Sequence, residues 1–477
     1  MRKFTGKILI AMLTIGLVGQ TFSYPVKADL NKKQYQGVKL DAKNFPDKKL
    51  REALKTVDDN HDGFISVLEQ ENYNPSKYDY EVQTWLDIEL GKGTVNLKGL
   101  SKLNYFTQFN FVGEDNNKTK IKFTNLSELA KCKNLSEISF TDIDTKTLTL
   151  ENLSVNKIST QNSKIKKITV RNNKKLKEFE GTGKCRNVVF GKNDKLKKVY
   201  IDGVSSVDLK ALKNLTLLEI NKGKIKKIDV TKNKNLTDLE LFHTNIKTLN
   251  LKKNKKLDNM RLKSNKVSKL DLSVNTKLTY LQIDEEPLKK LNVAKLKNLK
   301  WLSCESNQLK ALDVSKNTKL EMLYCAKNKI TALDVSKNKK LKTLECKDNV
   351  ISSIKIAETL EDLSAENNKL KTVDLSGAKS LFHLELGGNE LETLDLSACA
   401  TLYSLEVNDT KLSQLDISKN TEITYVNIKN TAIKTLDVTN NKKLYDENQT
   451  GEMAGYNVVC AKDVVLTSDG NVVYPKK

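Results

Sequence analysis

Residues 299–349 read LKWLSCESNQLKALDVSKNTKLEMLYCAKNKITALDVSKNKKLKTLECKDN. A leucine, a cysteine two residues later and an asparagine three residues after that recur every 21 residues. A single unit of this kind cannot bury its own apolar face, but stacked copies can, so the pattern predicts a solenoid. The recurring positions are Leu302, Cys304 and Asn307, then Leu323, Cys325 and Asn328, then Leu344, Cys346 and Asn349.

The same period can be followed in both directions from this stretch. It gives sixteen copies over roughly residues 95–445, mostly 21 residues apart, with shorter steps in 140–220 and 346–365 and an insertion at 113–120. The cysteine position is occupied upstream by Phe111, Phe140, Thr160, Gly181, Ile201, Ile220, Leu241, Leu262 and Ile283, and downstream by Ala365, Leu386, Val407 and Ile428.

Each part of the repeat has a structural interpretation. The alternating segment around the cysteine position predicts a short strand, and successive strands would pair in parallel about 4.8 Å apart. The asparagine amide would satisfy turning backbone groups along the stack. The LDVSKN half is short and polar, which favours turns or 3₁₀ pieces on the return side. The predicted fold is an α/β solenoid, a leucine-rich repeat horseshoe with a concave parallel sheet roughly 75 Å long over residues 94–445.

The LDVSKNTxL unit and the cysteine column resemble the internalin family of Gram-positive bacteria, of the internalin J type. The resemblance covers the repeats and the segment before them. It implies a role in adhesion or host interaction, and a helical, EF-hand-like cap that is mainly structural in that family.

The two ends of the chain do not follow the repeat. Residues 1–28 carry a basic start, an apolar run at 8–19 and a small-residue cleavage site, which predicts a signal peptide and a secreted chain with no transmembrane helix. Residues 446–477 predict a C-terminal cap with a hairpin of 464–467 and 471–474. The absence of an LPxTG signal there argues against covalent attachment to a cell wall.

Residues 29–93 predict a helical N-terminal cap. A helix is expected at 46–57, and DDNHDGFISVLE (58–69) then fits the EF-hand calcium loop at every constrained position. Calcium bound there would stabilise the cap and shield the first repeat, while the alternative is a purely structural cap. The expected Ca²⁺ ligands are Asp58, Asn60, Asp62, Phe64 through its carbonyl, Ser66 and Glu69.

The formal charge of +23 falls to +19 when the four basic residues of the leader are removed (82 − 59 − 4). Such a chain could be held on anionic wall polymers by a basic convex face. The alternative is a solvated lysine-rich face that keeps a long repeat protein soluble. Nucleic acid is not expected, because no aromatic–basic strip is present.

The cysteines and histidines do not indicate catalysis. Cys304, Cys325 and Cys346 stand where leucine or isoleucine stands elsewhere, so buried free thiols are expected. His243 and His383 fall about seven repeats apart, and no nucleophile motif or phosphate loop is found. A non-enzymatic, monomeric protein is predicted.

Binding is expected on the concave strands. Large side chains on consecutive strands predict an exposed aromatic patch with a polar rim, the pattern of an interface anchor, although the rings could also simply pack along the sheet. The expected partner is an extracellular protein or glycan, such as a host receptor. The predicted ligand-binding residues are Tyr280, Trp301, Met322 and Tyr324, with Phe242, Glu240 and Arg261 farther along.

Overall fold

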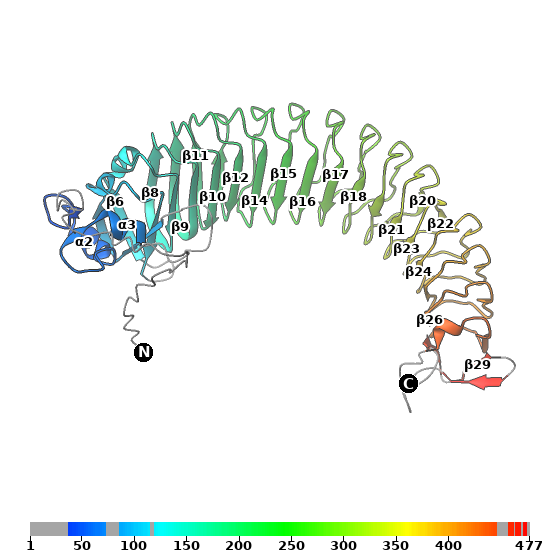
Figure 1. Ribbon diagram of the computed structural model, residues 1–477. Coiled ribbons are helices and arrows are strands. Elements are labelled where there is room, and N and C mark those ends of the chain that lie inside the picture. Colours follow the sequence, from blue (N-terminus) through cyan, green and yellow to red (C-terminus); the bar gives the residue numbers. More distant parts are fainter. Residues whose placement is uncertain are drawn as a thin grey trace, which may run out of the picture.

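The structure is a computed structural model that describes residues 37–72, 85–114, 119–445, 457–461, 463–468 and 471–474. The chain forms a curved solenoid, drawn as an arch in Figure 1. The predicted signal peptide lies outside the described residues. No helix among those residues is long and apolar enough to cross a membrane.

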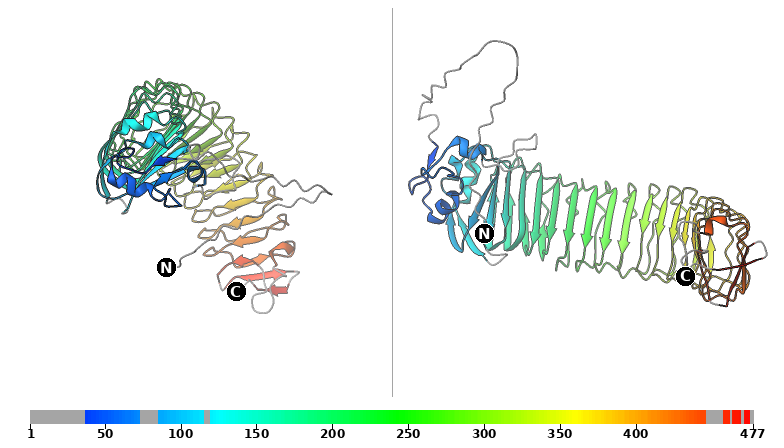
Figure 2. Two further views of the ribbon diagram at one scale, coloured as in Figure 1. Left: turned by 60° about the vertical axis from the view of Figure 1, so that its left-hand side comes forward. Right: turned by 60° about the horizontal axis from the view of Figure 1, so that its bottom comes forward.

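One parallel ladder of strands runs along the inside of the arch, and Figure 2 shows these strands side by side along one face. It begins with β3, ahead of the expected boundary at residue 94, and its neighbours pair in chain order. Its members are β3 (Trp85–Leu90), β5 (Gln108–Gly113), β7 (Glu137–Thr141), β9 (Lys157–Arg171), β10 (Glu178–Gly183), β12 (Lys198–Asp202), β14 (Leu217–Asn221), β15 (Asp238–Phe242), β16 (Asn259–Lys263), β17 (Tyr280–Asp284), β18 (Trp301–Ser303), β19 (Met322–Tyr324), β21 (Thr343–Glu345), β23 (Asp362–Ser364), β24 (His383–Glu385), β25 (Ser404–Glu406), β26 (Tyr425–Asn427) and β28 (Val458–Val459).

The predicted register is confirmed, including the repeats with the most irregular spacing. Phe111 pairs with Phe140, Phe140 with Thr160, and Thr160 with Gly181. Gly181 then pairs with Ile201. Inward residues of each strand are buried because they face the stacked core, which makes the leucine-rich repeat horseshoe the observed fold.

A second parallel ladder runs along the return side of the early repeats. Turns or 3₁₀ pieces were expected there, and that prediction is wrong for these repeats, because segments such as NVVF (187–190) alternate and pair like the inner strands. The 3₁₀ pieces that do form include η1 (Leu100–Lys102) and η2 (Leu126–Lys131). The ladder contains β4 (Gly93–Asn96), β6 (Thr119–Thr124), β8 (Ile143–Glu151), the second half of β9, β11 (Asn187–Phe190) and β13 (Ser206–Asp208).

From about residue 225 onward the return side consists mostly of turns, as predicted, with short strands at β20 (Ala332–Asp334) and β22 (Ser353–Lys355). The predicted asparagine ladder is confirmed here. Asn328 donates through Nδ2 to the carbonyl oxygens of Cys304 and Cys325, at 2.9 and 3.1 Å. Its Oδ1 accepts from the backbone N–H of Leu309 at 3.0 Å. Each amide therefore ties one repeat to the previous one.

A second asparagine ladder, which was not predicted from the sequence, lies at the SKN turns. Asn338 donates through Nδ2 to the carbonyl oxygens of Val314 and Asn317, at 3.0 and 2.9 Å. These amides bond across repeats on the outer side, where strands are few. Others with the same bonds are Asn233, Asn254, Asn275, Asn317, Asn420 and Asn441.

The two ends carry small additional elements. At the N-terminal end, α2 (Lys48–Leu54) and α3 (Val67–Asn72) flank a loop, and β1 (Val38–Lys39) pairs antiparallel with β2 (Phe64–Ile65) inside it. Helix α2 is shorter than the expected 46–57 and is capped by the side chain of Asp47. At the other end, β29 (Val465–Ser468) pairs parallel with β27 (Thr435–Asp437) and antiparallel with β30 (Asn471–Val473), and η3 (Lys442–Leu444) lies between β27 and β29 in the sequence.

Candidate functional site

Three of the predicted ligand-binding residues form one aromatic stack on the concave sheet. Tyr280 and Trp301 are partners on β17 and β18, and their rings are parallel within 3° with centroids 4.1 Å apart. The ring of Tyr324 on β19 follows at 5.4 Å from Trp301, tilted by 40°. All three are half-buried, because each ring covers part of its neighbour. The aromatic stack is thus fixed in place before any ligand arrives.

Met322 lies beside this stack and is 38% exposed. It is the strand partner of Trp301, and the Tyr324 hydroxyl lies 3.8 Å from its sulfur. Because methionine adapts its shape readily, it extends the stack with a flexible apolar surface.

The remaining predicted residues gather around one guanidinium group. Arg261 lies 3.3 Å from the carboxylate of Glu240, and its charge sits over the ring of Phe242 with 5.1 Å to the centroid. Its Nε also donates to Gln282 at 3.0 Å, on the same strand as Tyr280. This cluster and the aromatic stack are therefore continuous along β15 to β19.

Carboxylates line the concave face beside the stack. Asp284 is only 5% exposed and accepts hydrogen bonds from the Ser303 hydroxyl at 2.6 Å and the Glu305 backbone N–H at 3.0 Å. Burial raises the pKa of Glu305, and repulsion from Glu345 and Asp284 adds to the rise. In the described part of the chain, neither Asp284 nor Glu305 forms an ion pair. The surface around the rings thus carries negative charge without a full set of counter-ions.

A second exposed aromatic pair, which was not predicted from the sequence, lies farther along the arch. The rings of Phe382 and Tyr403 stack at 4.8 Å with 9° between their planes, and the side chains are 40% and 42% exposed. His383 meets both rings edge-on and lies 2.7 Å from the Asp362 carboxylate. Phe382 and Tyr403 each stand one residue before a strand begins, at the repeat position that Lys300 occupies before β18. The alternation within the strands therefore does not predict this pair.

The predicted calcium loop has the backbone turns that such a loop requires. Asp58 is 5% exposed and accepts from the backbone N–H groups of Asp62 and Gly63, both at 3.0 Å. Asn60 accepts from the N–H of Asp62, and Asp62 accepts from that of Phe64, both at 2.8 Å. Gly63 has a φ of 83°, which allows the sharp bend at position 6 of the loop.

The last two predicted ligands close the loop onto α3. Glu69 accepts from the N–H of Ser66 at 2.7 Å and from that of Asn60 at 3.3 Å, while the Ser66 hydroxyl accepts from the N–H of Glu69 at 3.1 Å. The donor set is all oxygen, so the residues fit a Ca²⁺ ion in chemistry. Within the described residues, however, no three His, Cys, Asp or Glu side chains converge into a metal-binding group. The acids of the loop bond backbone N–H groups instead.

All seven cysteines are free thiols. Cys304, Cys325 and Cys346 are fully buried in the core, as the sequence predicted. Burial raises the pKa of Cys346 to about 12, and it raises the pKa of the other two as well. A thiol in that state does not act as a nucleophile near neutral pH.

The comparisons with known proteins agree with this architecture. No family model and no curated protein matches the sequence. The functional domain of InlJ from Listeria monocytogenes, which includes a cysteine ladder, is 22% identical with a TM-score of 0.51, covering 85% of this chain and 79% of that one. A leucine-rich repeat protein of Leptospira interrogans is 19% identical, with a TM-score of 0.54 over 70% of this chain and 87% of that one.

A third similar structure is the plant peptide hormone receptor RGFR1 in complex with RGF2. It is 13% identical, with a TM-score of 0.54 over 80% of this chain and 71% of that one. These likenesses confirm the predicted internalin-like leucine-rich repeat fold, and at this level of identity they concern the fold alone.

Proposed function

We propose that this protein is an exported, non-enzymatic recognition protein that binds a protein ligand through its concave face, in adhesion or host interaction. The observation that carries the proposal is the aromatic stack of Tyr280, Trp301 and Tyr324 beside the carboxylates of Asp284 and Glu305. Stacked repeats supply the rigid sheet, and the exposed side chains of that sheet supply the contacts.

The geometry favours a ligand segment with cationic side chains. Aromatic faces attract ammonium and guanidinium groups, and nearby carboxylates add to that attraction. The rings are already ordered by mutual stacking, so ligand binding would cost little side-chain conformational entropy. The RGFR1 structure, which has a peptide hormone receptor in complex with RGF2, supports the general idea of a repeat surface that binds a polypeptide.

A peptide array tests this proposal. Binding of the protein to peptides that alternate Lys or Arg with apolar residues would be compared with its binding to their Glu-substituted counterparts. Its binding to neutral oligosaccharides would be measured on the same array. We expect the native chain to retain the cationic peptides. The double variant Trp301→Ala/Tyr324→Ala should bind at least tenfold more weakly, since aromatic anchors of an interface carry about 2 kcal/mol or more each.

The chain supplies its own matched control. The double variant Phe382→Ala/Tyr403→Ala removes the other exposed aromatic pair and should leave binding of the peptides within about twofold. If both double variants lose binding equally, or if only oligosaccharides are retained, the proposed site or the proposed ligand class is wrong.

We further propose that the loop of residues 58–69 binds Ca²⁺ and stabilises the N-terminal cap. When bound, Ca²⁺ would be held by Asp58, Asn60, Asp62, the carbonyl of Phe64 and Glu69, with Ser66 at the ninth loop position. The pairing of β2 with β1 supports this, because it supplies the strand partner that a second loop provides in paired EF-hands. Addition of millimolar Ca²⁺ should raise the unfolding temperature of the native chain and not that of Glu69→Gln, whereas an equal rise in both would contradict the assignment.

A further inference from the structure

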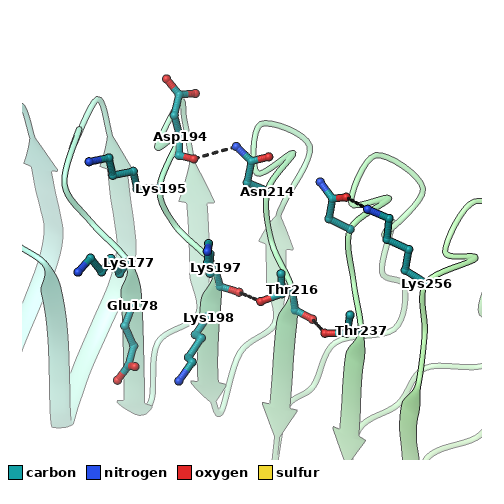
Figure 3. A pocket seen from close by; sticks show the side chains of 11 residues that line it. Lys177, Glu178, Asp194, Lys195, Lys197, Lys198, Asn214, Thr216, Thr237 and Lys256 are labelled. Carbon is teal, nitrogen blue, oxygen red and sulfur yellow. Dashed lines mark hydrogen bonds between the residues drawn. The ribbon is translucent and has the colours of Figure 1, made fainter. Parts of the chain in front are cut away.

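A lysine-lined hollow lies on the flank of the arch, away from the aromatic stack, where the turns of the early repeats lead into β10, β12, β14 and β15. Its volume is about 780 Å³. Figure 3 shows its side chains rising from successive repeats along one edge of the sheet. The residues lining it are Lys177, Glu178, Asp194, Lys195, Lys197, Lys198, Asn214, Thr216, Asn235, Thr237 and Lys256.

The charges in this hollow do not balance. Its two carboxylates already have partners outside it: Glu178 lies 3.1 Å from Lys157, and Asp194 lies 3.4 Å from Lys192. Among the residues that the structure describes, the five lysines of the lining form no ion pair; they are Lys177, Lys195, Lys197, Lys198 and Lys256. The hollow therefore presents five exposed ammonium groups that no neighbouring carboxylate neutralises.

The uncharged part of the lining bonds mainly to the backbone. The Thr216 hydroxyl donates to the carbonyl oxygen of Lys197, and the Thr237 hydroxyl to that of Thr216, both at 3.1 Å. Asn214 donates to the carbonyl oxygen of Asp194 at 2.8 Å. These bonds, drawn as dashed lines in Figure 3, link successive repeats into a rigid floor. Recognition of a ligand then rests on the ammonium groups.

The spacing of these lysines suits a linear ligand that runs along the arch. The backbone N–H of Lys197 donates to the carbonyl oxygen of Lys177 at 2.9 Å, so the two stand on adjacent repeats, about 4.8 Å apart. Lys256 stands three repeats beyond Lys197, roughly 15 Å away at the same spacing, and its ammonium group is positioned by the Asn235 amide oxygen at 2.7 Å. Charges at both ends of a long hollow match a chain of anions better than one compact ion.

The side-chain chemistry of the lining limits the classes of ligand that the hollow can bind. Lysine ammonium groups act as point charges and bind phosphate well, and the lining contains no arginine fork for bidentate carboxylate or sulfate recognition. It also contains no aromatic ring on which a nucleobase could stack. We propose that this lysine hollow is a second binding site, independent of the concave face, for a linear phosphodiester polymer without bases, such as a poly(glycerol phosphate).

Titration of the full-length mature chain with poly(glycerol phosphate) of about twenty units, at 50 to 200 mM salt, tests the proposal. The variant Lys177→Gln/Lys197→Gln/Lys256→Gln should bind at least tenfold more weakly. The slope of log affinity against log salt should fall by about 2, because each phosphate that a lysine neutralises adds roughly 0.7 to the slope. All three side chains are exposed, so the folded structure should persist, which circular dichroism would verify.

The control variant Lys316→Gln/Lys337→Gln/Lys419→Gln removes the same charge from lysines of the SKN turns and should change affinity by less than twofold. Equal losses in the two triple variants would overturn the proposal in favour of diffuse attraction by the net charge. Tighter binding of poly(dT) or of a heparin oligosaccharide than of poly(glycerol phosphate) would overturn the assigned ligand class. The aromatic variant Trp301→Ala/Tyr324→Ala should bind the polymer like the native chain.

Discussion

The early repeats, residues 85–221, and the cysteine-ladder repeats, residues 280–365, solve the same stacking problem in different ways. The early repeats have strands on both sides and a core rich in phenylalanine. The later ones have a strand on the inner side and mostly turns on the outer side, and their core consists largely of leucine and cysteine. Asparagine amides bond successive repeats in both regions, as Asn193 does to the carbonyl oxygen of Val170 at 2.9 Å, but in the later repeats they do so with few outer strands beside them.

The two kinds of repeat also differ in how they shape the arch. Two strand ladders both advance by about 4.8 Å per repeat, so the inner and outer sides of the solenoid grow in length equally. Turns held by side-chain amides impose no such fixed spacing. The distance between successive repeats can therefore be larger on the outer side than on the inner side. In Figure 1, β10 to β17 stand nearly in a row, although no outer strand is found among the described residues between β14 and β17, while β21 to β26 turn away along the arch. Outer turns therefore permit the outer side to spread but do not by themselves bend the arch. The aromatic stack spans β17 to β19, where the first part passes into the second, and the lysine hollow lies on the straighter part.

The largest expected effect comes from breaking the phenylalanine core. Phe111 is fully buried, stacked on Phe140 at 5.2 Å and edge-on to Phe123 at 5.7 Å. Phe111→Ala should lower the free energy of unfolding of the early repeats by about 3–5 kcal/mol. Trp85 reports on the early repeats and Trp301 on the later ones, so urea unfolding of the single-tryptophan variants Trp301→Phe and Trp85→Phe resolves the two regions.

The matched change in the later repeats is Cys325→Ala, which removes one buried sulfur atom and should cost about 1 kcal/mol, in the range of single-group core deletions. We expect Phe111→Ala to shift the Trp85 transition more than the Trp301 transition. Equal shifts at both tryptophans would show that the solenoid unfolds as one unit, and the distinction between the two regions would then have no energetic meaning.

A buried glutamate interrupts the asparagine ladder at the start of the later region. Glu286 is 2% exposed and occupies the ladder position. It accepts from the backbone N–H and the side-chain amide of Asn265 and from the N–H of Val267, all at 2.8 Å. Glu286→Ala leaves these donors without partners and should cost about 2–4 kcal/mol.

Glu286→Asn restores the residue that the ladder uses elsewhere and should cost less than half as much in the same urea experiment, because one amide oxygen can still accept from Val267 or Asn265. If the asparagine variant is as unstable as the alanine variant, the position requires two carboxylate oxygens and does not belong to the ladder.

The inner strand of each repeat could be predicted from the sequence, because each inward residue recurs at a fixed spacing and its burial follows from the period. Even Thr160 and Gly181, which carry no apolar signal, were placed correctly by counting from their neighbours. The return strands of the early repeats do not follow from the LDVSKN half, because that half is typical of the later repeats and predicts turns, although early segments such as 187–190 alternate like strands.

The functional surfaces were less accessible to prediction. The column positions of Tyr280 and Trp301 follow from the period, but the parallel stacking of their rings depends on side-chain angles that no pattern encodes. The lysine hollow could not be foreseen for a related reason. Eighty-two basic residues are spread over the chain, and only the structure shows which ones in the hollow remain without a carboxylate partner.

The smallest expected effect compares two glutamates of the inner face, one that is paired with a lysine in the early repeats and one that other glutamates surround farther along. In the early repeats Lys157 lies 3.1 Å from both Glu178 and Glu180. In the later repeats burial raises the pKa of Glu366, and repulsion from Glu385 and Glu406 adds to the rise. Because a carboxyl with a raised pKa binds protons more readily in the folded chain than in the unfolded chain, its contribution favours folding increasingly as the pH falls from neutral.

Glu366→Gln should therefore raise the unfolding temperature slightly at pH 7, by about 1 °C, and the gain should vanish near pH 4, where Glu366 is largely protonated in the native chain as well. Glu178→Gln removes a paired carboxylate and should lower the unfolding temperature at pH 7 by a similar amount. Thermal unfolding of both variants at the two pH values measures the contrast. A fall in the unfolding temperature of Glu366→Gln at pH 7 would mean that its carboxylate is stabilised by a cation, as that of Glu178 is, and the contrast between the two glutamates would then be wrong.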